Sequence, residues 1–268
     1  MGRIEATFQD LQSRGEKALI TFLTAGDPNL ACTEQLIHAL VEAGVDIIEL
    51  GFPFSDPMAD GPTIQLASER ALASGTNLAG ILSMVRDVRK HTNTPIVLMG
   101  YYNPILHYEP ARFAQEAAAA GVDGLLLVDL PPEEEGEIRP FFEDAGICLI
   151  TLIAPTTPLE RSRQLAQRGQ GFLYYVSMTG VTGSQQVNAT SIEEAVHELQ
   201  SLSPLPVAVG FGIASPSDAE AVARFADGVV VGSALVRVIA EHGDSPSLLP
   251  EVKRFVSDLK EAVRSASL

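Results

Sequence analysis

The stretch A-G-V-D-I-I-E-L-G-F-P-F-S-D-P-M-A-D-G, residues 43–61, holds the pattern that decides the fold. An Ala-Gly pair ends a helical segment, which is the usual helix stop before a strand. A short apolar run follows, and then a loop rich in Pro and Gly. The A-G-V-D unit recurs at 120–123, and A-G-I-C at 145–148 repeats its form. The sequence therefore predicts a repeated helix, glycine and strand unit.

Working outward from that unit, eight strand-like runs alternate with helical patterns along the chain. They span residues 18–24, 45–50, 95–99, 122–128, 147–153, 171–177, 206–210 and 227–232. We interpret this order as α/β, a single (β/α)8 TIM barrel domain covering 1–268. A doubly wound open sheet is the alternative, although no G-x-G-x-x-G follows the first strand. Additional helices are expected at 3–14 and 248–266, and residues 63–91 could form two.

Composition limits the partners of the chain. The 268 residues are 46% hydrophobic, enough for a sizeable core. A formal charge of −16 argues against nucleic acid or a membrane surface as partner. Two cysteines make no disulfide framework, the first residues do not resemble a signal peptide, and no apolar run approaches the length of a membrane span. We expect a cytoplasmic protein.

Glu49 is an acid inside a predicted core strand. Period-two alternation places it on the face of Ile47, opposite Ile48 and Leu50. If that face points into the barrel, burial raises the pKa of the carboxyl, which suits a general acid and base. The structural alternative is a buried ion pair, but no Lys or Arg occurs within 45–61.

Asp56 and Asp60 lie in the loop that follows. Asp is common in turns and helix caps, and that explanation suffices for either residue alone. In a loop after a strand that ends near Glu49, one of them becomes a candidate second carboxylate. Spacing does not decide which one.

Glycine-rich turns follow the last three predicted strands, at 179–184, 210–215 and 231–235. Barrels of this type often bind phosphate with the loops after strands 7 and 8. Glycine lets backbone N–H groups approach an anion, and Ser233 at a helix start can add a hydroxyl. A single turn of this kind would be an ordinary bend; three in succession favour phosphate.

The positions of lysine and histidine limit the kinds of reaction that the chain could catalyse. None of the four lysines follows a strand, so an imine intermediate is not expected. The five histidines are scattered, so no metal site is expected either. The sequence predicts carboxylate acid–base chemistry on a phosphorylated substrate.

Beyond these patterns, F-P-F-S-D-P-M-A-D-G-P-T-I-Q at 52–65 resembles the signature loop of the tryptophan synthase alpha chain family. Further blocks resemble that family in the same order, and the resemblance covers essentially the whole chain. They are T-F-L-T-A-G-D-P (21–28), G-Y-Y-N-P-I (100–105), D-L-P-P-E-E (129–134), G-V-T-G (180–183) and G-F-G-I (210–213).

The resemblance implies a retro-aldol lyase that cleaves indole-3-glycerol phosphate to indole and glyceraldehyde 3-phosphate. The family's catalytic acid falls on Glu49 and its second carboxylate on Asp60. Residues 178–190 would form a lid. The other implied residues are Tyr174, Phe22, Leu127, Ile153, Phe211 and Thr182 toward the substrate, and Gly183, Gly212, Gly232 and Ser233 toward its phosphate. For the apolar ones, barrel core is the structural alternative.

The resemblance also implies an αββα complex whose beta chain carries pyridoxal phosphate, with no cofactor in this chain. Asp56 and Pro57 in loop 53–60, and Asn103 in loop 101–108, would face that partner.

Three other functions remain open at this point. Another phosphate-binding barrel, such as a sugar-phosphate epimerase, would need a metal or a different base. A non-catalytic regulatory subunit would not need a desolvated Glu49. A free-standing indole-producing lyase would differ only in not depending on a beta chain.

Overall fold

The strands form one parallel sheet that closes on itself. The computed structural model describes residues 1–176, 189–210, 212–243 and 245–266. Within them, nine strands pair in the order β5-β4-β3-β2-β1-β9-β8-β7-β6. The strands are β1 (Ala18–Thr24), β2 (Ile47–Gly51), β3 (Ile96–Gly100), β4 (Gly124–Leu127), β5 (Cys148–Leu149), β6 (Thr151–Ile153), β7 (Leu173–Val176), β8 (Val207–Gly210) and β9 (Gly228–Val231).

One barrel strand is split into β5 and β6. Only Ile150 separates them, and β5 pairs with β4 while β6 pairs with β7. The two halves therefore join the ends of the sheet, and the predicted eight-stranded barrel is confirmed.

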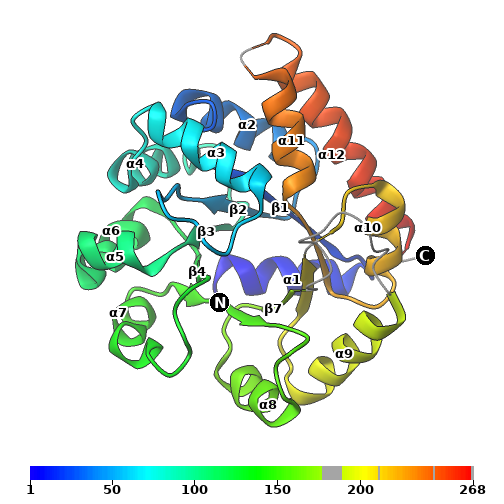
Figure 1. The fold of residues 1–268 in the computed structure, drawn as a ribbon. Helices are drawn as coiled ribbons and strands as arrows, with labels where there is room; N and C mark the ends of the chain where they lie inside the picture. The colour runs from blue at the N-terminus through cyan, green and yellow to red at the C-terminus, as the bar shows by residue number, and fades with distance from the viewer. Residues whose placement is uncertain (177–188, 211, 244, 267–268) are drawn as a thin grey trace.

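Helices surround the strands, as Figure 1 shows. They are α1 (Arg3–Ser13), α2 (Leu30–Glu42), α3 (Pro62–Ala73), α4 (Leu78–Val88), α5 (Tyr102–Tyr108), α6 (Pro110–Ala120), η1 (Glu135–Glu137), α7 (Arg139–Asp144), α8 (Leu159–Arg168), α9 (Ala189–Leu202), α10 (Pro216–Ala223), α11 (Ser233–His242) and α12 (Leu248–Ser265). The expected helices before β1 and at the C-terminal end are confirmed as α1 and α12. The segment expected to hold two helices forms α3 and α4.

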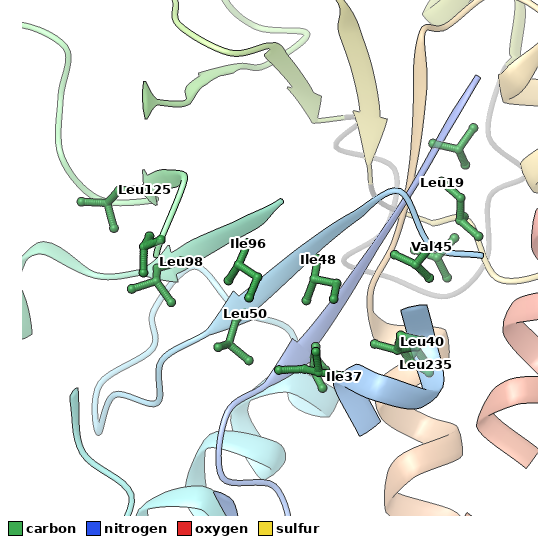
Figure 2. Packing of buried hydrophobic residues seen from close by; sticks show 14 of the residues in the cluster. Leu19, Ile37, Leu40, Val45, Ile48, Leu50, Ile96, Leu98, Leu125 and Leu235 are labelled. Atoms are coloured by element: carbon green, nitrogen blue, oxygen red, sulfur yellow. The ribbon is translucent and has the colours of Figure 1, made fainter. Parts of the chain in front are cut away.

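The core has two layers because side chains alternate along each strand. Outward-facing residues such as Ile48, Leu50 and Leu98 pack against the surrounding helices (Figure 2). Inward-facing residues such as Ile47 and Val97 form a second cluster inside the barrel. Helix α1 contributes Ile4, Phe8 and Leu11 to that inner cluster, and it crosses the middle of the ring in Figure 1.

An aspartate precedes three of the strands and binds the start of the neighbouring strand. Each accepts a backbone N–H with a carboxylate oxygen. The pairs are Asp46 with Leu19 at 2.7 Å, Asp123 with Ile96 at 2.9 Å and Asp227 with Val207 at 3.0 Å. Each of these aspartates also forms an ion pair with a Lys or Arg. These aspartates, two of them from A-G-V-D units, thus tie adjacent strands together at the amino-terminal end of the barrel.

Candidate active site

Glu49 lies inside the barrel, near the carboxyl-terminal end of β2. Its neighbours in register are Phe22 on β1 and Val97 on β3. The side chain shares the inward face with Ile47, as the alternation predicts, and the residue is 0% exposed. In barrels of this architecture the chemistry takes place at this end.

The carboxyl group of Glu49 has no counter-charge. Among the described residues, neither of its oxygens has a hydrogen-bond partner, and no ion pair involves it. The alternative of a buried ion pair therefore finds no support in this part of the chain. Burial disfavours the ionised form and raises the pKa of Glu49 to about 8. The group is accordingly a neutral acid at pH 7, able to donate a proton.

Tyr174 is an aromatic neighbour of Glu49 within the barrel. It is buried in the inner cluster, on β7. Its hydroxyl lies against Gly210 of β8, where an added Cβ would come within 2.3 Å of the oxygen. Burial, together with the negative charge of an ionised Glu49, raises the pKa of the Tyr174 hydroxyl well above its usual value. The phenol therefore stays neutral beside the carboxyl group.

Phe22 on β1 lies next to Glu49 in the strand register. Its ring extends over Gly51, where a Cβ would lie 2.5 Å from a ring carbon. Any larger residue at position 51 would push this ring aside. Phe22, Gly51 and Asp60 line a common cavity. Glu49 is completely buried below it, near the same end of the barrel.

Asp60 ends the loop between β2 and α3. Burial raises the pKa of its half-buried carboxyl, and the neighbouring Tyr101 hydroxyl partly offsets that rise. The same hydroxyl accepts the Ala59 N–H at 3.0 Å, and Gln65 Nε2 donates to the Asp60 carbonyl at 2.8 Å. The loop backbone on both sides of the carboxylate is thus held in place.

Only part of the candidate phosphate site lies within the described residues. Gly232 is the N-cap of α11, and its carbonyl accepts the Val236 N–H at 3.1 Å. Ser233 is the exposed first residue of that helix. Gly212 is exposed with φ of 82°, a conformation that favours glycine. Gly183, Thr182 and Phe211 lie outside the described residues, as does most of the expected lid.

Two residues expected to line the indole slot face the other way. Leu127 and Ile153 pack with the outer layer, against the helices, on the faces of their strands opposite to the barrel interior. Their outward direction follows from alternation, because Leu126 and Leu152 take the inward positions. Leu127 and Ile153 therefore belong to the hydrophobic core, which is the structural alternative to a place in the substrate slot.

Sequence reasoning missed several residues that face the interior at this end. Met99, Val128 and Leu152 are partly buried and pack on the inner cluster. Met99 and Val128 also line the cavity that contains Asp60. Side-chain alternation along β3, β4 and β6 predicts these inward positions, as it predicts the inward position of Glu49 on β2.

The residues expected to face a partner lie at the surface. Asp56 and Asn103 are exposed, Pro57 is half-buried, and Met58 between Asp56 and Asp60 is 85% exposed. Ser55 Oγ donates to Asp56 at 2.5 Å. A groove runs along loop 54–58 to α3. Met58 and Leu72 are both exposed and line this groove, and adjoining exposed apolar side chains are typical of a surface that another molecule covers.

The described residues contain neither a metal-binding cluster nor a membrane-spanning helix. No group of three or more His, Cys, Asp or Glu there could hold a metal ion. None of the helices there is long and apolar enough to cross a bilayer.

The closed barrel, with the buried Glu49 and the half-buried Asp60 at its carboxyl-terminal end, defines the class: a (β/α)8-barrel enzyme. Within that class, the chain belongs to the tryptophan synthase alpha chain family, whose sequence model matches residues 8–264. Enzymes of this family cleave indole-3-glycerol phosphate to indole and glyceraldehyde 3-phosphate, and this chain performs that lyase half-reaction.

Individual relatives match this chain over nearly its full length. The chain is 54% identical to the tryptophan synthase alpha chain of Citrifermentans bemidjiense over 267 residues, which is 100% of both chains. It is 55% identical to that of Geobacter sulfurreducens over 263 residues, covering 98% of this chain and 99% of the relative. The crystal structure of tryptophan synthase subunit alpha from Legionella pneumophila superimposes with a TM-score of 0.92 at 41% identity, covering 99% of each chain.

Proposed function

We propose that Glu49 is the general acid and base of the cleavage. Protonated at neutral pH, it would donate its proton to the indole ring carbon that carries the side chain. The resulting carboxylate would then take the proton of the adjacent hydroxyl as the carbon–carbon bond breaks. The observation that carries this assignment is the burial of Glu49 without any partner in the described chain. A structural carboxylate would be paired.

Asp60 is the second carboxylate in this proposal. Protonation of the ring carbon places positive charge on the indole ring. An ionised Asp60 would accept a hydrogen bond from the ring N–H and stabilise that charge. Glu49 and Asp60 differ in burial, so one stays neutral while the other, half-buried, ionises more readily.

The substrate would lie between these carboxylates and the start of α11. Gly232, Ser233, Gly212 and Gly183 would hold the phosphate with backbone N–H groups and a hydroxyl. Tyr174 and Phe22 would hold the substrate beside Glu49, with Phe211 and Thr182 from the loops above. In place of Leu127 and Ile153, the inward-facing residues Met99, Val128 and Leu152 complete the apolar slot.

The family implies a beta chain as partner. We propose an αββα complex in the cytoplasm, with loops 53–60 and 101–108 against the beta chain. Asp56, Pro57 and Asn103 would lie in that interface, and indole would pass directly to the partner. The exposed Met58 and the adjacent groove support this surface as the contact.

Pyridoxal phosphate would belong to the partner alone. A Schiff base needs a lysine free to react at the site. In the described structure, each lysine of this chain forms an ion pair with a carboxylate. The pairs are Lys17 with Asp227, Lys90 with Asp87, Lys253 with Glu42, and Lys260 with Asp46. The residues of this chain therefore do not fit that cofactor.

Product release tests the proposal. Purified chain is given indole-3-glycerol phosphate, alone and with a beta chain from the same source, and glyceraldehyde 3-phosphate is measured. Slow release that rises strongly with the beta chain supports an alpha subunit under allosteric control. Rapid release that the beta chain does not change supports a free-standing lyase. If neither condition releases product, the assigned roles are wrong.

A further inference from the structure

Thr24 has a buried hydroxyl with no described partner. It lies at the end of β1, on the inward face with Ile20 and Phe22. The residue is 3% exposed, and its Oγ1 makes no hydrogen bond to any described residue. Leaving a buried hydroxyl unpaired costs about 1–3 kcal/mol, so such groups generally bind something.

Thr24 lines the cavity that also contains Asp60. Ser68 on α3 and Tyr101 after β3 add polar groups to its wall. The space open to the centre of a water-sized sphere is about 10 Å³. One water molecule needs a minimum of roughly 10–15 Å³ measured in this way, together with two to four polar partners. The cavity is therefore at the lower size limit for one water, and its wall includes polar side chains that could bind it.

We propose that this cavity holds one ordered water shared by the Thr24 hydroxyl and the Asp60 carboxylate, and that Thr24 positions Asp60 through it. The inference rests on the proposed role of Asp60. A hydrogen bond from this water would stabilise the ionised carboxylate, which is the form that can stabilise positive charge on the indole ring. Among the described residues, Tyr101 is the one titratable group that acts on the pKa of Asp60.

Thr21 provides a matched control. It is a second threonine on β1 whose buried hydroxyl has no described partner. It lies on the outward face with Leu19 and Leu23, away from the cavity. Thr24→Val and Thr21→Val therefore remove the same atom from the same strand, one from the residue that shares a cavity with Asp60 and the other from the face toward the helices.

The first readout is the pH profile of kcat/KM for indole-3-glycerol phosphate cleavage. Thr24→Val is expected to lower kcat/KM about tenfold, the loss of one charge-assisted hydrogen bond. Without the water bond the pKa of Asp60 rises, so the acidic limb of the profile moves to higher pH. Thr24→Ser, which keeps the hydroxyl, and Thr21→Val should keep the wild-type profile. An unshifted limb in Thr24→Val would overturn the proposal.

The second readout needs no activity. A high-resolution crystal structure of the wild-type chain is expected to show one water within hydrogen-bond distance of both Thr24 Oγ1 and an Asp60 carboxylate oxygen. A cavity without that water, or a direct bond between the two side chains, contradicts the inference. If the wild type cleaves nothing yet the water is present, the proposed function fails while the hydration site stands.

Discussion

Two buried carboxylates, one at each end of this barrel, differ in their pairing. At the amino-terminal end, Asp123 is 7% exposed and fully paired. Its oxygens accept from Arg3 at 2.8 Å, from Arg89 at 2.6 Å and from the Ile96 N–H at 2.9 Å. At the other end, Glu49 is equally buried and has no described partner.

The difference in pairing distinguishes a carboxylate that stabilises the fold from one that can take part in a reaction. A buried ion pair that is completely hydrogen-bonded holds its elements together, and removing one partner leaves the other charge stranded. A buried acid without partners lowers stability when it ionises, because its charged form is not solvated. An unpaired buried acid of this kind is typical of a functional site, where its proton takes part in a reaction. The pairing of a carboxylate, more than its burial, indicates whether it serves structure or chemistry. Asp27, which is buried at the same end as Glu49, is paired with Arg70 and therefore counts as structural.

The largest effect is expected from Glu49→Gln. The amide has nearly the same shape but cannot donate and recover a proton, so kcat for cleavage should fall by roughly 10³-fold. The fold should persist, as monitored by circular dichroism, and so should the binding of glycerol phosphate. Turnover within tenfold of wild type would remove the catalytic role of Glu49.

Asp123→Ala should affect stability instead of chemistry. The substitution leaves the almost completely buried guanidinium of Arg89 without its carboxylate partner. It should lower the free energy of unfolding by about 3–5 kcal/mol. Urea denaturation measures this loss. Glu220→Ala is the control, because it breaks the exposed pair with Arg224 and should cost less than about 1 kcal/mol. Activity per folded molecule should survive in both variants; a catalytic defect in Asp123→Ala would break the distinction between the two ends.

Asp60→Asn is expected to act at the carboxyl-terminal end with a smaller effect than Glu49→Gln. The amide oxygen can still accept a hydrogen bond from the indole N–H but carries no charge. We expect kcat to fall by about 10²-fold, the usual loss for one electrostatic contact in the transition state. Steady-state kinetics checks this. A rise in KM with unchanged kcat would mean that Asp60 only binds the substrate.

The smallest expected effect concerns the phosphate. Gly232→Asp places a negative charge at the start of α11 and should weaken glycerol phosphate binding by about tenfold through repulsion. Gly232→Ala is the matched control. Its added Cβ would meet nothing closer than the Phe22 Cβ at 3.5 Å, an ordinary contact, so affinity should hardly change. Calorimetric titration distinguishes them, and equal affinities would exclude Gly232 from the phosphate site.

Local patterns predicted much of this molecule. Alternation and the Ala-Gly stops gave all eight barrel strands within a few residues, and alternation also gave the inward direction of Glu49. The same rule places Leu127 and Ile153 on the outward faces of β4 and β6, so only the family resemblance, and not the alternation, pointed to them as slot residues.

The remaining features depend on contacts between distant parts of the chain. Lys260 pairs with Asp46 from 214 positions away, and Tyr101 reaches the Ala59 N–H across 42 positions. A threonine in a strand such as Thr24 is ordinary by composition. Its importance arises only from the cavity that α3 and β3 complete around it.

The protonation state of Glu49 gives the most direct test of the contrast between the two ends. Infrared difference spectra between the wild type and Glu49→Gln, recorded against pH, isolate the carbonyl band of this one acid. We predict a protonated band at neutral pH that disappears with a midpoint at about 8. A carboxyl group that is already ionised at pH 6, near its ordinary pKa of about 4.3, would contradict the assignment of Glu49 as the proton donor.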